Sequence, residues 1–281
     1  MGLENKMSPE FVLSGIKVVD FSRLLPGPWA TQMMADFGAE VIKVEQPIIG
    51  DGARHNPPNY ETTSAYFHSV NRNKRDIALD LSKPEGQAVA HRLIAEADVV
   101  LESYRVGVTK KLGIDYETAK KLNESVVYCS ITGFGQDGPL APIPGHDLVI
   151  QAMTGIMGVN LERGLGVPEV PLFQAGDYAA GGIAMIGILL ALMRRQQTGE
   201  GRFIDCSMFD SLFSMANIAL SAGMAQDAGG RARCAAAQAS ARRAQQPRYP
   251  PDQRRHGFQR RGALSRRAVR IPKACVPWQR R

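Results

Sequence analysis

The sequence predicts an α/β fold in which a parallel β-sheet is covered by helices. The main observation is that short apolar runs of strand length alternate with segments of helical periodicity through the first half of the chain, which is typical of βαβ units. The second observation is composition. A chain of 281 residues with 44% hydrophobic content is enough for one large soluble domain or two ordinary ones.

Two βαβ units are predicted near the N-terminus. Their elements follow in the order strand, helix, strand, twice over: 16–22, 28–39 and 40–46, then 77–81, 84–97 and 98–103. Gly38 is expected to end the first helix, because glycine readily adopts the left-handed conformation found there. Ser82 is the expected N-cap of the second helix, since Pro84 follows in the first turn.

Later elements extend the sheet and cover it. They are helix 115–123, strand 125–131, a helix from His146 to about Met157, a helix from Asp177 to about Gln197, strand 202–208 and helix 209–224. Between the second and third of these lies a loop rich in glycine and proline, residues 133–145. Loops of this kind often carry functional residues, so we expect a site beside it.

Charge is divided unevenly along the chain. Residues 226–281 carry a formal charge of +13 without apolar periodicity, whereas the preceding 225 residues carry −6. We therefore expect an N-terminal extension (1–13), a folded body (14–225) and an Arg-rich tail (226–281) that is disordered or aberrant. The tail is interpreted either as a basic arm that binds nucleic acid nonspecifically or as the product of out-of-frame translation. The tail carries no groove-reading motif of the kind that specific binders have, which favours the second.

Other features favour a cytoplasmic protein without a bound metal. The four cysteines show no CxxC pair and no metal-ligand spacing, which fits a reducing compartment. The first ten residues carry no secretory or lipid-anchor signal. The most apolar stretch, 179–193, is shorter than the roughly 20 residues of a membrane span, so we interpret it as a buried helix.

The first turn between strand and helix argues against a nicotinamide cofactor. Residues 22–30 read SRLLPGPWA and lack the GxGxxG pattern that holds a dinucleotide pyrophosphate, although Glu45 ends the second strand much as a ribose-binding acid would.

That turn also begins seven sequence blocks that together resemble the class III CoA-transferase family, which includes α-methylacyl-CoA racemase. The blocks are DFSRLLPGPWATQMMADFGAEVIKVEQP (20–47), NRNKRDIALDL (71–81), ADVVLESYRVGVTKKLGI (97–114), ITGFGQDGP (131–139), GHDLVIQAMTGIMG (145–158), AGDYAAGG (175–182) and TGEGRFIDCSMFDSL (198–212). The resemblance implies a Rossmann-like large domain, incomplete over residues 14–225, that binds acyl-CoA as a substrate and has no permanently bound cofactor. It further implies a carboxylic acid as second substrate and an interlocked homodimer when the C-terminal half is intact.

Asp177 is the candidate catalytic carboxylate. It follows Gly176 at the start of a predicted long helix, where an aspartate is a favourable N-cap and where the helix dipole would lower its pKa. The resemblance matches Asp177 to the family nucleophile. That residue attacks the acyl-CoA thioester to give a mixed anhydride, and CoA thiolate then forms an aspartyl-CoA thioester.

His146 leaves two alternatives open. It lies in the GHD block, at the position where family members with racemase activity carry a histidine, so it could exchange an α-proton with Asp177 on the opposite face of the thioester. Alternatively, His146 and Asp147 only cap the helix that follows the loop. The sequences DFSRLLPGP and VIQAMTGIM favour the transferase.

Six residues are candidates for binding CoA: Arg23, Asn71, Lys74, Tyr104, Arg105 and Lys111. The four basic ones are predicted to lie in loops at strand ends, where they would hold phosphates, or else to be solvated surface charges. The resemblance favours binding for Lys74 and Arg105. Arg105-Val106-Gly107 departs from the family's Arg-Pro-Gly, so this loop is expected to be less rigid.

Three functions therefore remain open. The first is a CoA-transferase and the second an acyl-CoA racemase. The third is an inactive fragment that at most binds CoA or a partner chain, or binds nucleic acid through its tail.

Overall fold

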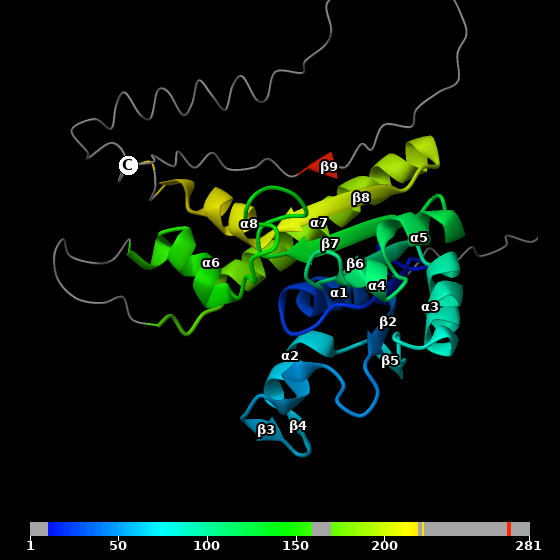
Figure 1. Cartoon of the computed structure of the whole chain (residues 1–281), viewed down its shortest axis with the longest axis horizontal. Coiled ribbons are helices and arrows are strands. Elements are labelled where there is room, and N and C mark those ends of the chain that lie inside the picture. The colour runs from blue at the N-terminus through cyan, green and yellow to red at the C-terminus, as the bar shows by residue number, and fades with distance from the viewer. Residues whose placement is uncertain (1–10, 159–169, 219–220, 222–268, 271–281) are drawn as a thin grey trace, which may run out of the picture.

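A parallel sheet forms the centre of the molecule. The computed structural model describes residues 11–158, 170–218, 221 and 269–270. The sheet has the order β5-β2-β1-β6-β7-β8-β9, and Figure 1 shows it running from β5 at one edge to β9 at the other. Its strands are β1 (Lys17–Asp20), β2 (Glu40–Glu45), β5 (Arg75–Ala78), β6 (Val99–Glu102), β7 (Val127–Thr132), β8 (Arg202–Ser207) and β9 (Val269–Arg270). All neighbouring pairs are parallel.

Helices cover both faces of the sheet. Successive residues of a strand point to opposite faces, and the apolar residues on each face form a core with one layer of helices. On β6, Val99 and Leu101 join the core under α1 (Pro26–Asp36) and α7 (Ala175–Thr198). Val100, between them, joins the core under α3 (Pro84–Glu96) and α5 (Tyr116–Leu122). These elements confirm the predicted Rossmann-like α/β fold.

The order of the first six strands decides where a ligand can bind. Numbered along the chain, these strands of the sheet lie in the order 3-2-1-4-5-6, the doubly wound arrangement. The chain crosses to opposite sides of the sheet after β1 and after β6, which leaves a crevice at their carboxyl ends. The loops that follow these strands therefore define the place for a site.

Most predicted helices and strands are present, with ends that differ by a few residues. The helix expected from His146 to Met157 is α6 (Asp147–Met153) followed by a short 3-10 turn, Ile156–Gly158, and α8 (Met208–Met215) is shorter than 209–224. Ser82 does not cap α3: Lys83 occupies the N-cap, and the Ser82 hydroxyl donates to Asp80 instead, 2.6 Å away. Proline at the first helical position needs no partner for its nitrogen.

Residues 48–74 contain elements that the sequence analysis does not predict. They are a 3-10 turn (Gly52–His55), a hairpin of β3 (Asn59–Tyr60) and β4 (Thr63–Ser64), and α2 (Ala65–Asn71). A further short helix, α4 (Val108–Lys111), follows β6, and Gly107 precedes it with φ of 85°, a conformation that glycine adopts without strain.

Helix α7 is the apolar stretch that was interpreted as a buried helix. At 24 residues it is long and apolar enough by composition to cross a membrane, yet 56% of its apolar window is buried within the protein. It contacts α1, α6, α8, β7 and β8. The packing is that of a core helix.

Two residues of the predicted Arg-rich tail form a strand. Val269 and Arg270 of β9 pair in parallel with Ile204 and Asp205 of β8. The remainder of 226–281, and with it the choice between a nucleic-acid arm and an out-of-frame product, lies outside the described residues.

Candidate active site

A cavity of about 1060 Å³ opens at the carboxyl ends of the central strands. Its walls come from the loops after β1, β6 and β7 and from the start of α7, in agreement with the position of the crevice. Five of the predicted site residues line it: Arg23, Tyr104, Arg105, His146 and Asp177. The fold thus brings together residues that are far apart in the sequence.

Asp177 lies in the first turn of α7 but is not its N-cap. Gln174 occupies that position, and it makes no side-chain capping bond. The pKa of Asp177 is raised to about 7, mainly because the carboxyl is buried and additionally because of the negative charge of Asp147. The expectation of a lowered pKa is therefore wrong: removal from water outweighs the favourable end of the helix dipole.

Asp147 provides the cap that α7 lacks. Its Oδ1 accepts hydrogen bonds from the backbone nitrogens of Gly176 at 2.7 Å and Asp177 at 3.2 Å. His146 is the N-cap of α6 by backbone conformation, but its side chain makes no capping bond. Within the GHD block, Asp147 thus caps α7 and not α6, the helix that it begins. The imidazole of His146 remains at the cavity wall.

Arg23 and Tyr104 form one basic wall of the cavity. The Arg23 guanidinium donates from Nη2 to the Tyr104 hydroxyl at 3.1 Å and lies 4.6 Å from the centre of the tyrosine ring. Its backbone nitrogen donates to Ser103 Oγ at 3.0 Å, which joins the loops after β1 and β6. Arg105 is exposed in the second of these loops. Both guanidinium groups could therefore bind phosphate or carboxylate groups.

Lys74 and Asn71 do not line the cavity. Lys74 Nζ is buried and donates to Asp20 Oδ2 at 3.1 Å, to Pro28 O at 2.8 Å and to Asn71 Oδ1 at 2.8 Å. Burial lowers its pKa to about 8 despite the charge of Asp20. The expectation of a loop cation is corrected by this geometry, because a lysine with three acceptors in the interior holds the structure around the first βα turn.

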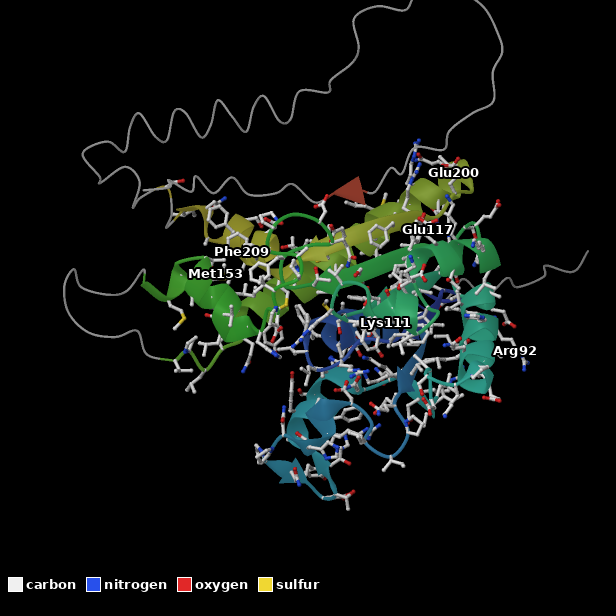
Figure 2. All side chains as sticks on the ribbon, in the orientation of Figure 1. Arg92, Lys111, Glu117, Met153, Glu200 and Phe209 are labelled. Carbon is white, nitrogen blue, oxygen red and sulfur yellow. The ribbon has the colours of Figure 1, made fainter. Side chains whose placement is uncertain are left out.

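Lys111 ends α4 and is exposed (Figure 2). Its neighbours Val108 and Leu112 line the cavity, but Lys111 does not. Contact between this ammonium and CoA stays a prediction.

Two further ionisable residues, one at the cavity wall and one at the end of β6 outside the cavity lining, were not expected. Tyr66, from α2, lines the cavity, and burial, followed by the negative charge of Asp177, raises the pKa of its hydroxyl above the usual value. Glu102, at the end of β6, is 2% exposed, and burial raises its pKa to about 7. Its Oε2 accepts from the backbone nitrogen of Tyr104 at 2.8 Å. The only signal for Glu102 was a charged residue closing an apolar strand.

No group of three or more histidine, cysteine, aspartate or glutamate side chains that could hold a metal ion occurs among the residues the structure describes.

Residues 13–246 match CoA-transferase family III. The chain belongs to this family. The match extends past residue 225, where the sequence analysis ended the folded body.

Curated members of CoA-transferase family III are similar to this chain over most of its length. A succinate–glutarate CoA-transferase of Agrobacterium fabrum is 43% identical over 209 residues, which are 70% of this chain and 51% of the relative. The human succinyl-CoA:glutarate CoA-transferase is 40% identical over 71% of this chain and 45% of its own length. An acetyl-CoA:oxalate CoA-transferase of Acetobacter aceti is 38% identical, with 75% and 54% covered. The chain spans about half the length of these relatives.

Solved structures agree with this assignment. A CAIB/BAIF family protein from Brucella suis superposes with a TM-score of 0.70 at 42% identity, over 73% of this chain and 55% of that one. A Mycobacterium tuberculosis protein gives a TM-score of 0.71 at 32% identity, over 79% and 61%.

Proposed function

We propose that the cavity binds acyl-CoA and that Asp177 is the nucleophile of a CoA transfer to a carboxylic acid. One observation carries this proposal: a half-buried carboxyl group, whose pKa is raised to about 7 mainly by burial, lies at the start of α7 in a cavity that two arginines also line. Buried carboxyls in clefts with perturbed pKa values are frequent at active sites. Membership of a CoA-transferase family supports the same chemistry.

The transfer can be written as four displacements at acyl carbons. The Asp177 carboxylate attacks the thioester carbonyl and expels CoA thiolate, which leaves a mixed anhydride. The thiolate attacks the Asp177 carbonyl, which releases the donor acid and forms an aspartyl-CoA thioester. The acceptor carboxylate then displaces the thiolate to give a second anhydride. Attack of the thiolate on the acceptor carbonyl yields the new thioester and regenerates the Asp177 carboxylate.

The basic wall would orient both substrates. Arg23 and Arg105 supply guanidinium groups, which bind phosphates and carboxylates in a bidentate manner. The names of the similar proteins reported above give succinate, glutarate or oxalate as their substrates. Short dicarboxylic acids are therefore the acceptors to test first, with CoA as a substrate and not as a resident cofactor.

A covalent adduct tests the proposal. Incubation with succinyl-CoA followed by hydroxylamine is expected to place a hydroxamate on the peptide that contains Asp177, which a mass spectrum detects. The rate of labelling should rise between about pH 6 and pH 8, because the nucleophile is the ionised carboxylate. Asp177→Asn should give no adduct. An equal yield of adduct from this variant would contradict the assignment.

The racemase remains the second candidate, because His146 and Asp177 line the same cavity. It requires exchange of the substrate α-proton with deuterated solvent in the absence of any Asp177 adduct. A cytoplasmic location, proposed from the pattern of the cysteines, and an interlocked dimer, proposed from the family, are both retained as proposals.

A further inference from the structure

The first turn of α7 is held from outside the helix. The backbone nitrogens at a helix start have no partner within the helix, and they are normally satisfied by the N-cap side chain. In α7 the Gln174 side chain makes no such bond. Two of these nitrogens, those of Gly176 and Asp177, donate to Oδ1 of Asp147 on α6. The backbone of the proposed nucleophile is thus bonded directly to a second carboxylate.

Asp147 is itself fixed on its other oxygen. Gln151, one turn further along α6, is 4% exposed and donates from Nε2 to Asp147 Oδ2 at 2.6 Å. The same Nε2 donates to the carbonyl of Phe173, just before α7, at 2.9 Å. Side chain and backbone therefore form one part-buried network that joins α6 to the start of α7.

Gly176 makes this close approach possible. A Cβ atom at this position would lie 3.0 Å from Asp147 Oδ1 and 3.1 Å from Ile150 Cγ2, so one of these side chains would have to move. Gly182 in the same helix is a useful contrast, because a Cβ there would meet only Trp29 at an ordinary 3.7 Å. The two glycines separate the effect of the Asp147 contact from the general effect of glycine in a helix.

Asp147 acts on Asp177 through its negative charge as well as through its hydrogen bonds. An ionised Asp177 beside another carboxylate is destabilised by repulsion of like charges. The ester-like carbonyl of an acylated Asp177 carries no charge, so acylation removes this repulsion. The other titratable or charged side chains that line the cavity are Arg23, Tyr66, Tyr104, Arg105, His146 and Tyr178.

We propose that Asp147 is a positioning residue for Asp177: it fixes the first turn of α7 and favours the acylated, neutral state of the nucleophile over the free carboxylate. This inference rests on the proposed function, in which Asp177 becomes acylated. Gln151 supports this role, since its side chain holds the Asp147 carboxylate in place.

The test separates the charge of Asp147 from its hydrogen bonds. Asp147→Asn keeps an oxygen that can accept from Gly176 and Asp177 but removes the charge and replaces the acceptor of Gln151 Nε2 with an amide nitrogen. Asp147→Ala removes the charge and both acceptors. The first measurement needs no substrate: the carboxyl carbon of Asp177 is titrated by NMR in protein labelled with ¹³C-aspartate, and its signal is assigned by its loss in Asp177→Asn. We expect Asp147→Asn to lower the titration midpoint by about one pH unit. An unchanged midpoint would overturn the inference.

The second measurement is the acyl adduct at a fixed succinyl-CoA concentration. Asp147→Asn is expected to reduce the fraction of acylated chain several-fold at pH 8. Asp147→Ala and Gly176→Ala, which disturb the first turn of α7, are expected to lower the rate of acylation. Gly182→Ala should behave as the parent. Equal acylation in the parent and in Asp147→Asn contradicts the inference. Absence of an adduct from the parent, with the midpoint still shifted by Asp147→Asn, contradicts the proposed function and leaves the electrostatic link between the two aspartates supported.

Discussion

Asp177 and Glu102 show how strongly burial changes the chemistry of a carboxyl group. The sequence could indicate that Asp177 begins a helix, because Gly176 precedes it and an apolar helical pattern follows. It could not indicate that the group is buried beside Asp147, a residue 30 positions earlier in the chain. Since burial and a like charge both raise the pKa, the direction of the shift was predicted wrongly.

Glu102 leads to a prediction about stability and pH. Its pKa is raised from 4.5 to about 7, so the folded state binds this proton more tightly than the unfolded state. The contribution of Glu102 to stability is therefore present below about pH 4.5 and is lost as the pH rises to 7. Glu102→Gln should increase the free energy of unfolding by about 2–3 kcal/mol at pH 8 and have little effect at pH 4. Urea denaturation at the two pH values measures this.

The control for this experiment is Glu124→Gln. Glu124 is exposed in the turn before β7, so its replacement should leave the pH profile of stability unchanged. If Glu102→Gln and its parent show parallel profiles from pH 4 to pH 8, Glu102 does not carry the buried proton.

At the level of helices and strands, periodicity predicted most elements but missed those between residues 48 and 74 and helix α4. Helix α7 has 24 residues and a continuous apolar pattern, whereas α2 has 7 residues and no repeated pattern to detect. Tyr66 was missed for that reason. Lys74 was expected to be a loop cation at a strand end, and the family resemblance favoured its binding to CoA. Its burial depends on Asp20 and Pro28, which the fold brings to it from β1 and α1.

Lys74 is predicted to stabilise the fold, not to bind substrate. Lys74→Met leaves the fully buried Asp20 without its ammonium partner, so we expect a loss of about 3–5 kcal/mol in the free energy of unfolding. Lys17→Met is the matched control, because the ion pair of Lys17 with Glu96 is largely exposed and should contribute little. Thermal and urea denaturation measure both variants. Equal stability of the two variants would contradict the structural role of Lys74.

At the scale of the whole molecule, the observed order of the strands explains where the cavity lies. Alternating strands and helices imply a parallel sheet with right-handed crossovers, and the observed order 3-2-1-4-5-6 places the crevice between the carboxyl ends of β1 and β6. The position of the cavity follows from this order, and so does the convergence of Arg23, Tyr104 and Arg105. The sequence could not show how deeply each side chain is buried. This burial distinguishes Lys74, which lies in the interior, from the residues at the cavity wall.

The fate of oxygen atoms tests the central claim, that Asp177 is a covalent nucleophile. In the proposed sequence of displacements, an oxygen of the acceptor carboxylate bridges the second anhydride and stays on Asp177 when CoA leaves with the acceptor. The protein is incubated with succinyl-CoA and ¹⁸O-labelled glutarate and digested, and the mass of the Asp177 peptide is measured. We predict that this peptide gains ¹⁸O while peptides that contain Asp147 do not. Formation of glutaryl-CoA with no ¹⁸O in the Asp177 peptide would contradict the account.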